Sequence, residues 1–269
     1  MNLDLISSKL EQLQTKPGQN TDQQKFDRST VFWKAPMGKS QIRFVPYKEN
    51  KDNPFTEVYF HYGIGNRTMI SPINYGEKDP IVEFSKELRK TSEPENWRLA
   101  KKLEPKMRVF APVIIRGEEN KGVRFWEFGK QVYQELLSYA ADEDYGDFTD
   151  VVSGLDMTVE VVQGNPYPQT SIRVKPKQSP LSDDNTSVEK WLADQPELLK
   201  YYKKYSYDEM KTALQDWLNP EESTGETATE ALLNDPSDLE KKALDPGYTL
   251  NVKTKETVSD SDFDDLFKD

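Results

Sequence analysis

The chain has 269 residues, with 36 Lys and Arg against 47 Asp and Glu, and a formal net charge of −11. Its hydrophobic fraction of 35% lies below the roughly 45–50% of most globular chains, so we expect one packed domain with solvated segments. Because it has no Cys and a single His, disulfides, thiolate metal sites, cysteine nucleophiles and multi-histidine zinc chemistry are excluded. No stretch resembles a membrane span or a secretory signal, which predicts an intracellular protein that does not contact a membrane.

The charge is distributed unevenly along the chain. Residues 28–137 carry 20 basic and 14 acidic side chains, whereas residues 138–218 carry 8 and 15 and residues 219–269 carry 5 and 14. A basic block that is rich in aromatic residues therefore lies within an acidic chain. This distribution favours a nucleic-acid partner, which the net charge alone would not.

The first predicted element is an N-terminal arm, residues 1–20. Its apolar residues recur at three- to four-residue spacing, at Leu3, Ile6, Leu10 and Leu13. This spacing predicts a short amphipathic helix that could support self-association.

Residues 28–180 form a predicted β-rich core. Runs of alternating apolar and polar residues predict strands at 31–33, 41–45, 58–62, 108–115, 123–128, 157–162 and 171–175. An insert, residues 64–106, contains a predicted helix at 80–90, and further helices are predicted at 129–141 and in the helical segment 186–218. Short antiparallel strands with added helices predict an α+β chain, mainly β, with an oligonucleotide-binding (OB) fold, a Greek-key barrel.

The C-terminal region is predicted to be disordered. Residues 219–258 read as a linker, and residues 259–269 form an acidic tail with interspersed apolar residues. The tail is either a solubilising end, a polyanion that competes for the basic surface, or a short motif that binds partner proteins. The expected partner-binding residues are Phe263, Asp264, Asp265, Leu266 and Phe267.

Two predicted central strands combine cations with aromatic rings. Alternation puts Arg108 and Phe110 on one face of the first strand, and Arg124, Trp126 and Phe128 on one face of the second. We predict that these are the same face of neighbouring strands. Cations that follow phosphates and rings that stack on bases are what a single strand requires. The alternative is that the rings are core residues and the cations form a solvated rim.

The predicted nucleic-acid site draws on residues throughout the core. The expected base-stacking residues are Trp97, Phe110, Trp126 and Tyr167. The expected phosphate contacts are Lys101, Lys102, Arg108, Arg124 and Lys130, flanked by Tyr133, Arg173 and Lys175.

Several short motifs occur in an order that resembles one known family. They are Ile42-Arg-Phe-Val-Pro46, Asn53-Pro-Phe55, His61 with Gly63, Phe110-Ala111, Phe128-Gly-Lys130 with Tyr133, and the terminal Asp264-Asp-Leu266. The chain resembles the helix-destabilising single-stranded DNA-binding proteins of T-even-type phages, the products of gene 32. The resemblance covers about residues 1–180 and the tail.

The resemblance implies a function and several partners. It implies cooperative, sequence-nonspecific coating of single-stranded DNA in phage replication, recombination and repair, in the cytoplasm of an infected bacterial host. It implies groove roles for Trp97, Phe110 and Trp126, self-association along the DNA strand, and recruitment of replication and recombination proteins by the tail. The family has a basic N-terminal patch, whereas here only Lys9 lies in the corresponding stretch, so we expect weaker electrostatic cooperativity.

The same family binds a structural zinc through one His and three Cys in the insert. Here His61 is present, but Asp79-Pro-Ile-Val82 stands where a Cys pair would be. A structural zinc site normally needs four nitrogen or sulfur ligands. We therefore predict no metal and no cofactor, and we interpret His61 as a hydrogen-bonded strand residue.

Other classes of function fit the sequence less well. An enzyme is disfavoured, because the chain has no phosphate-binding loop or nucleophile elbow, and Glu83 and Lys86 are three apart, not two as in a nuclease Glu-x-Lys motif. A virion structural or assembly protein without nucleic-acid affinity is the alternative. RNA in place of DNA stays open, because stacking surfaces do not reliably read the 2′-hydroxyl.

Overall fold

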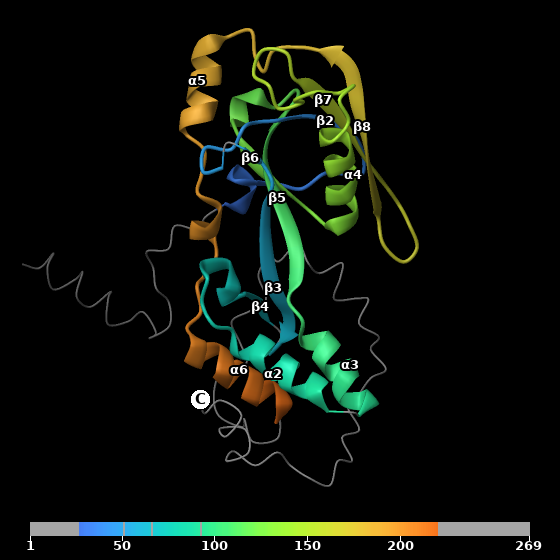
Figure 1. The fold of residues 1–269 in the computed structure, drawn as a ribbon. Helices are drawn as coiled ribbons and strands as arrows, with labels where there is room; N and C mark the ends of the chain where they lie inside the picture. The colour runs from blue at the N-terminus through green and yellow to red at the C-terminus, as the bar shows by residue number, and fades with distance from the viewer. Residues whose placement is uncertain (1–26, 51, 66, 92, 220–269) are drawn as a thin grey trace, which may run out of the picture.

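Strand β5 (Lys106–Ile115) lies at the centre of the fold (Figure 1). The computed structural model describes residues 27–50, 52–65, 67–91 and 93–219. β5 pairs antiparallel with three strands, namely β2 (Gly38–Phe44), β3 (Thr56–Ile64) and β6 (Arg124–Phe128). The N-terminal arm and residues 220–269, with the predicted linker and tail, lie outside the described residues.

Eight strands form one open sheet in the described part of the chain. The remaining strands are β1 (Phe32–Trp33), β4 (Arg67–Ile70), β7 (Leu155–Val162) and β8 (Gln169–Gln178). The main path runs β1-β6-β5-β2-β7-β8, and β4 extends the sheet from β3. A barrel closes only when its outer strands share hydrogen bonds, and the outer strands β8 and β1 do not pair. The mixture of strands and helices is confirmed, whereas the described strands form an open sheet in which the predicted Greek-key barrel is not detected.

Five α-helices and four short 3₁₀ turns accompany the described strands. The helices are α2 (Pro80–Lys90), α3 (Pro94–Leu103), α4 (Lys130–Ala140), α5 (Asn185–Ala193) and α6 (Tyr207–Leu218). The turns are η1 (Arg28–Thr30), η2 (Pro72–Tyr75), η3 (Glu119–Lys121) and η4 (Leu198–Tyr201). The helix predicted at 80–90 is confirmed. The segment 186–218 is two helices, because Pro196 disfavours helical backbone at the residue before it.

The helices divide between two ends of the β3–β5 pair (Figure 1). We call α2, α3, α6, β4 and the end of β3 the small lobe, and the rest of the sheet with α4 and α5 the sheet lobe. The small lobe has an apolar core of its own, made by Ile64, Met69, Ile81, Phe84, Leu103, Met210 and Leu214. Each helix therefore buries one face, as its amphipathic pattern requires.

Both faces of β5 are buried in the sheet lobe. Every side chain from Val109 to Ile115 is buried. Val109, Ala111 and Val113 belong to the main core, which α4 covers. Phe110 belongs to a second core, which the chain around η4 covers. We call residues 194–206, which run from α5 to α6, the strap.

The buried side chain of Arg43 joins β2 to β7 and to the loop that follows β8. The side chain of Arg43 is fully buried, and its Nε donates to Asp156 Oδ1 at 2.9 Å. Its Nη2 donates to the carbonyl of Ser179 at 2.8 Å. Arg116 Nη2 also donates to Asp156 Oδ1, at 2.8 Å. One carboxylate on β7 therefore neutralises guanidinium groups from β2 and from the end of β5.

We expect Asp156→Ala to destabilise the fold by about 3–5 kcal/mol, because it leaves Arg43 buried without its counter-ion. Glu160→Ala is the matched control, since it removes a carboxylate from the same strand that pairs with the exposed Arg173. That substitution should cost about 0–1 kcal/mol. Urea denaturation followed by circular dichroism measures both, and equal losses would show that Arg43 does not depend on Asp156.

Candidate nucleic-acid interface

The register of β5 and β6 decides which of their side chains share a face. Trp126 lies opposite Ala111, and Phe128 lies opposite Val109. Directly opposed residues of an antiparallel pair project from the same face. Trp126 and Phe128 are therefore on the main-core face, whereas Phe110 projects from the other. The predicted shared face of Arg108 and Phe110 with Arg124 and Trp126 is wrong, because alternation within each strand does not fix the phase between strands.

The two rings predicted to stack on bases at the centre of the site are covered by protein. Phe110 is 0% exposed, and its ring centroid lies 6.0 Å from that of Tyr202 in the strap. Trp126 is 3% exposed and lies 5.8 Å from Trp33 and 4.7 Å from Phe128. Neither ring presents a face to a nucleotide in this conformation, and both act as core residues.

The predicted arginines are also engaged within the protein. Arg124 is buried, and its Nη2 donates to Glu118 Oε2 at 2.5 Å. Arg108 is partly buried, and its Nε donates to Glu127 Oε1 at 2.7 Å. Each guanidinium already has a carboxylate partner, which reduces its value as a phosphate contact.

The exposed residues of the predicted site gather on another part of the molecule. Trp97 is 54% exposed on α3, and Lys101 lies one turn further along the same helix face. Lys130 is exposed at the first position of α4. Figure 1 shows α3 and α4 on the same side of the β3–β5 pair, with the strap on the opposite side. We call the side that carries Trp97, Lys101 and Lys130 the α3–α4 side.

The remaining predicted residues extend or flank this side. The β7–β8 loop, which holds Tyr167, lies beyond α4 on the same side (Figure 1). On β8, Lys175 is partly exposed, and Arg173 is exposed and pairs with Glu160 at 2.9 Å. Lys102 is directed elsewhere, since its Nζ lies 5.0 Å from the ring centre of Trp217 on α6.

The sequence did not single out Tyr59 and Met107, whereas Tyr133 on α4 is one of the predicted residues. Tyr59 on β3 lies opposite Met107 on β5, and both are partly exposed. The Tyr59 hydroxyl donates to Glu57 Oε2 at 3.1 Å. Burial and the nearby charge of Glu57 raise the pKa of Tyr133, which is itself buried. The alternation of Glu57 and Tyr59 with the buried Val58 and Phe60 is the signal that could have identified them.

A second group of rings and cations lies on the strap side. The Arg28 guanidinium lies 4.9 Å from the ring centre of Phe32 and 5.4 Å from that of Tyr202. Lys204 lies 4.8 Å from the ring centre of Tyr75. Burial raises the pKa of Tyr202 far above its ordinary value. These rings pack against the protein's own cations, an arrangement that stabilises the strap.

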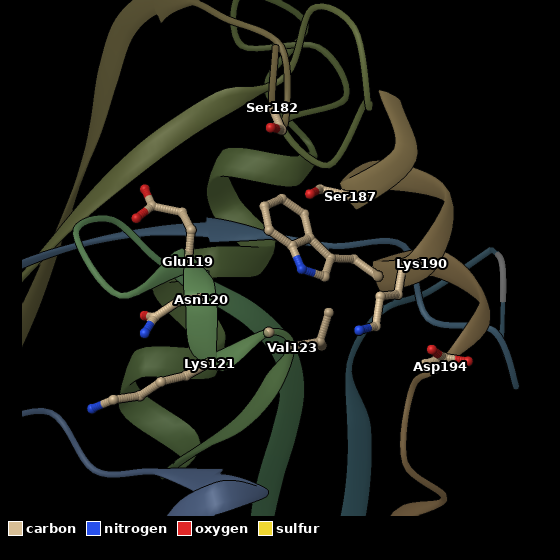
Figure 2. Close-up of a pocket in the computed structure, with 10 residues that line it drawn as sticks. Glu119, Asn120, Lys121, Val123, Ser182, Ser187, Lys190 and Asp194 are labelled. Carbon is tan, nitrogen blue, oxygen red and sulfur yellow. The ribbon is translucent and has the colours of Figure 1, made fainter. Parts of the chain in front are cut away.

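A hollow of about 460 Å³ lies apart from these residues, between α5 and the turn before β6 (Figure 2). Its polar walls include Glu119, Lys121, Ser187 and Lys190, which Figure 2 shows around it. None of the predicted DNA-binding residues lines it. Charges of both signs meet there, so the hollow offers no continuous path for a phosphate backbone.

The described residues of the insert, together with His61, do not offer a zinc site. His61 has both ring nitrogens engaged, with Leu103 O at 3.1 Å and Asp79 Oδ2 at 2.9 Å. Asp79 Oδ1 accepts from the N–H groups of Ile81 and Val82. Within the described ranges, no cluster of three or more His, Cys, Asp or Glu side chains could hold a metal ion. This donor set does not fit the four nitrogen or sulfur ligands of structural zinc.

The chain was compared with known proteins. Residues 37–218 match the model of a family described as gp32 DNA binding protein like. No curated protein matches the chain. None of the helices in the described part of the chain combines the length and the apolar character that a membrane crossing requires.

The burial of Trp126 and the exposure of Trp97 lead to opposite expectations for stability. Trp126→Ala should lower the free energy of unfolding by about 3–5 kcal/mol, because it removes a ring from the main core. Trp97→Ala should change it by less than about 1 kcal/mol. Urea denaturation of both variants tests this, and a Trp126→Ala protein as stable as the wild type would return the ring to the set of candidate nucleotide contacts.

Proposed function

The chain belongs to the gp32 DNA binding protein like family, and from this we propose that it coats single-stranded DNA without sequence preference. The family is a DNA-binding, non-enzymatic one, and its match covers all twelve residues predicted to contact DNA. The match is the observation that carries the proposal. The exposed rings and cations then support one side of the molecule as the path of the DNA.

We place the single-stranded DNA on the α3–α4 side. Lys101, Lys130 and Lys175 form no ion pair with any other described residue, so their charges are available to phosphates. Trp97 offers an exposed indole close to Lys101. Cations that follow the backbone and rings that stack on any base are sufficient for binding without sequence preference.

Trp97 is the leading candidate for base stacking. The Arg89 guanidinium lies 5.4 Å from the centre of its ring, and this contact helps to hold the indole against α2. A ring held in place loses less entropy when a base stacks on it. Tyr167 and Tyr59, further along the same side, are the next candidates.

The family function has further parts that concern segments outside the described residues. We propose that the N-terminal arm supports self-association along the strand and that the tail, with Phe263, Leu266 and Phe267, recruits replication and recombination proteins. The expected setting is the cytoplasm of an infected bacterium. The acidic tail would also compete with DNA for the basic side, since it carries the opposite charge.

Lys101→Ala and Lys130→Ala should each weaken binding to oligo-dT. The dependence of log K on log salt should fall by about 0.7 for each phosphate contact that a substitution removes. Fluorescence anisotropy of a labelled oligo-dT, measured at several salt concentrations, gives both affinity and slope. Lys204→Ala, on the strap side, is the matched control and should leave the slope unchanged.

Two results would contradict this prediction in different ways. If Lys204→Ala lowers the slope while the other two variants do not, the strand follows the strap side. If the wild-type protein binds neither oligo-dT nor oligo-rU, the alternative of a virion assembly protein without nucleic-acid affinity is favoured.

Trp97→Ala should weaken oligo-dT binding by about 1–3 kcal/mol without changing the salt slope, because a stacking ring carries no charge. Trp97→Phe is the matched control, since it keeps an aromatic face and should recover most of the affinity. The same anisotropy titration measures both variants. Equal affinities of the Ala variant and the wild type would remove Trp97 from the interface.

A further inference from the structure

His61 joins the small lobe to β3 through both of its ring nitrogens. The side chain is buried, 1% exposed, and Nδ1 lies 3.1 Å from the carbonyl oxygen of Leu103, the last residue of α3. Nε2 lies 2.9 Å from Oδ2 of Asp79, the N-cap of α2. A carbonyl oxygen can only accept, so Nδ1 must donate to it.

Asp79 is held by donors on both of its oxygens. Oδ1 accepts from the N–H groups of Ile81 and Val82 at 2.9 and 3.2 Å, which caps α2. Oδ2 accepts from Ser71 Oγ as well as facing His61. Burial raises the pKa of Asp79, but the hydrogen bonds from His61, Ser71 and Val82 and the charge of His61 outweigh it, so the pKa lies below its ordinary value. The contact between Nε2 and Oδ2 therefore joins His61 to the same carboxylate that caps α2.

These contacts bring four parts of the chain to one point. His61 comes from β3, Ser71 is the N-cap of η2, Asp79 caps α2, and Leu103 ends α3. A separate hydrogen bond, from Ser85 Oγ to the carbonyl oxygen of Ala100 at 2.9 Å, connects α2 directly to α3. The orientation of α3 relative to β3 is thus fixed by buried polar contacts in addition to apolar packing.

We propose that His61, Asp79 and Ser71 form a metal-independent lock that positions α3, and with it Trp97 and Lys101, for contact with the nucleic acid. The resemblance relates His61 and Asp79 to zinc ligands of the family, and here the hydrogen bonds of these side chains join β3, η2, α2 and α3. The three residues are positioning residues, since all three are buried within the protein. The positioning of Trp97 and Lys101 for nucleic acid rests on the proposed function, whereas the lock itself does not.

The substitutions at Asp79 separate the lock from ordinary helix capping. Asp79→Ala removes every contact of the carboxylate, and the melting temperature should fall by about 10 °C. Asp79→Asn keeps an acceptor for the α2 cap, and its amide can still form hydrogen bonds with His61 and Ser71, so most of the stability should return. Asp184→Ala is the control, because Asp184 caps α5 in the same way outside the small lobe. It should lower the melting temperature by about 3 °C.

The experiment uses the full-length protein and three measurements. Zinc content and the melting temperature with and without EDTA test metal independence. Hydrogen exchange of the amides in residues 94–103 reports on α3 without DNA, and it should be at least about 10-fold faster in Asp79→Ala than in Asp184→Ala. The salt slope of oligo-dT binding should fall by about 0.7 in Asp79→Ala, and by no more when Lys101→Ala is added, because both changes remove the same phosphate contact.

Each outcome decides a separate step. One zinc per chain together with a melting temperature that falls in EDTA would overturn metal independence. Unchanged exchange in residues 94–103 would overturn the lock, whatever the protein binds. Faster exchange with an unchanged salt slope would overturn the positioning role alone. If the wild-type protein binds no single strand, the proposed function fails while the exchange and EDTA results still decide the lock.

Discussion

The structure depends on the need to bury both faces of β5. From Val109 to Ile115 every side chain of this strand is buried, so one layer of protein on either side is required. Helix α4 supplies the layer over Val109 and Ala111, and the strap supplies the one over Phe110. A strand covered in this way cannot present its own rings to a ligand. The exposed rings and cations consequently lie on elements around β5, above all on α3 and at the start of α4.

The local elements could be predicted from the sequence better than their assembly. The helix at 80–90 follows from Asp79 as a capping residue, Pro80 at the first position and regular apolar spacing, all of which act within a few residues. The Greek-key barrel is not found among the described strands, and the shared face of Phe110 and Trp126 is wrong, for a common reason. Both depend on which residue of one strand lies opposite which residue of another, and composition within a strand carries no information about that register.

The candidate site shows the same division. Trp97, Lys101 and Lys130, which the sequence predicts as DNA contacts, are exposed on α3 and at the start of α4, and their role in binding stays a prediction. The sequence predicts a helical segment that includes Tyr202, whereas in the structure Tyr202 lies in the strap. An apolar and aromatic run is compatible with either arrangement. In the sequence alone, Asp79 indicates the start of a helix and the absence of a cysteine, but not its contacts with His61 and Ser71. Its partners His61 and Ser71 are distant in the chain, and only the fold brings their donors to its second oxygen.

The open sheet leaves β8 as an outer strand, and this has a consequence for the behaviour of the protein at high concentration. Among the described residues β8 pairs only with β7, so its other edge presents unpaired backbone groups to any second copy. Such edges promote aggregation unless charge or proline interrupts them. Here Arg173, Lys175, Pro176 and Lys177 follow one another along the strand. Repulsion between these positive charges and the missing N–H of Pro176 thus disfavour pairing of two sheets along their β8 edges. This matters for a protein that is expected to bind at high density along single-stranded DNA.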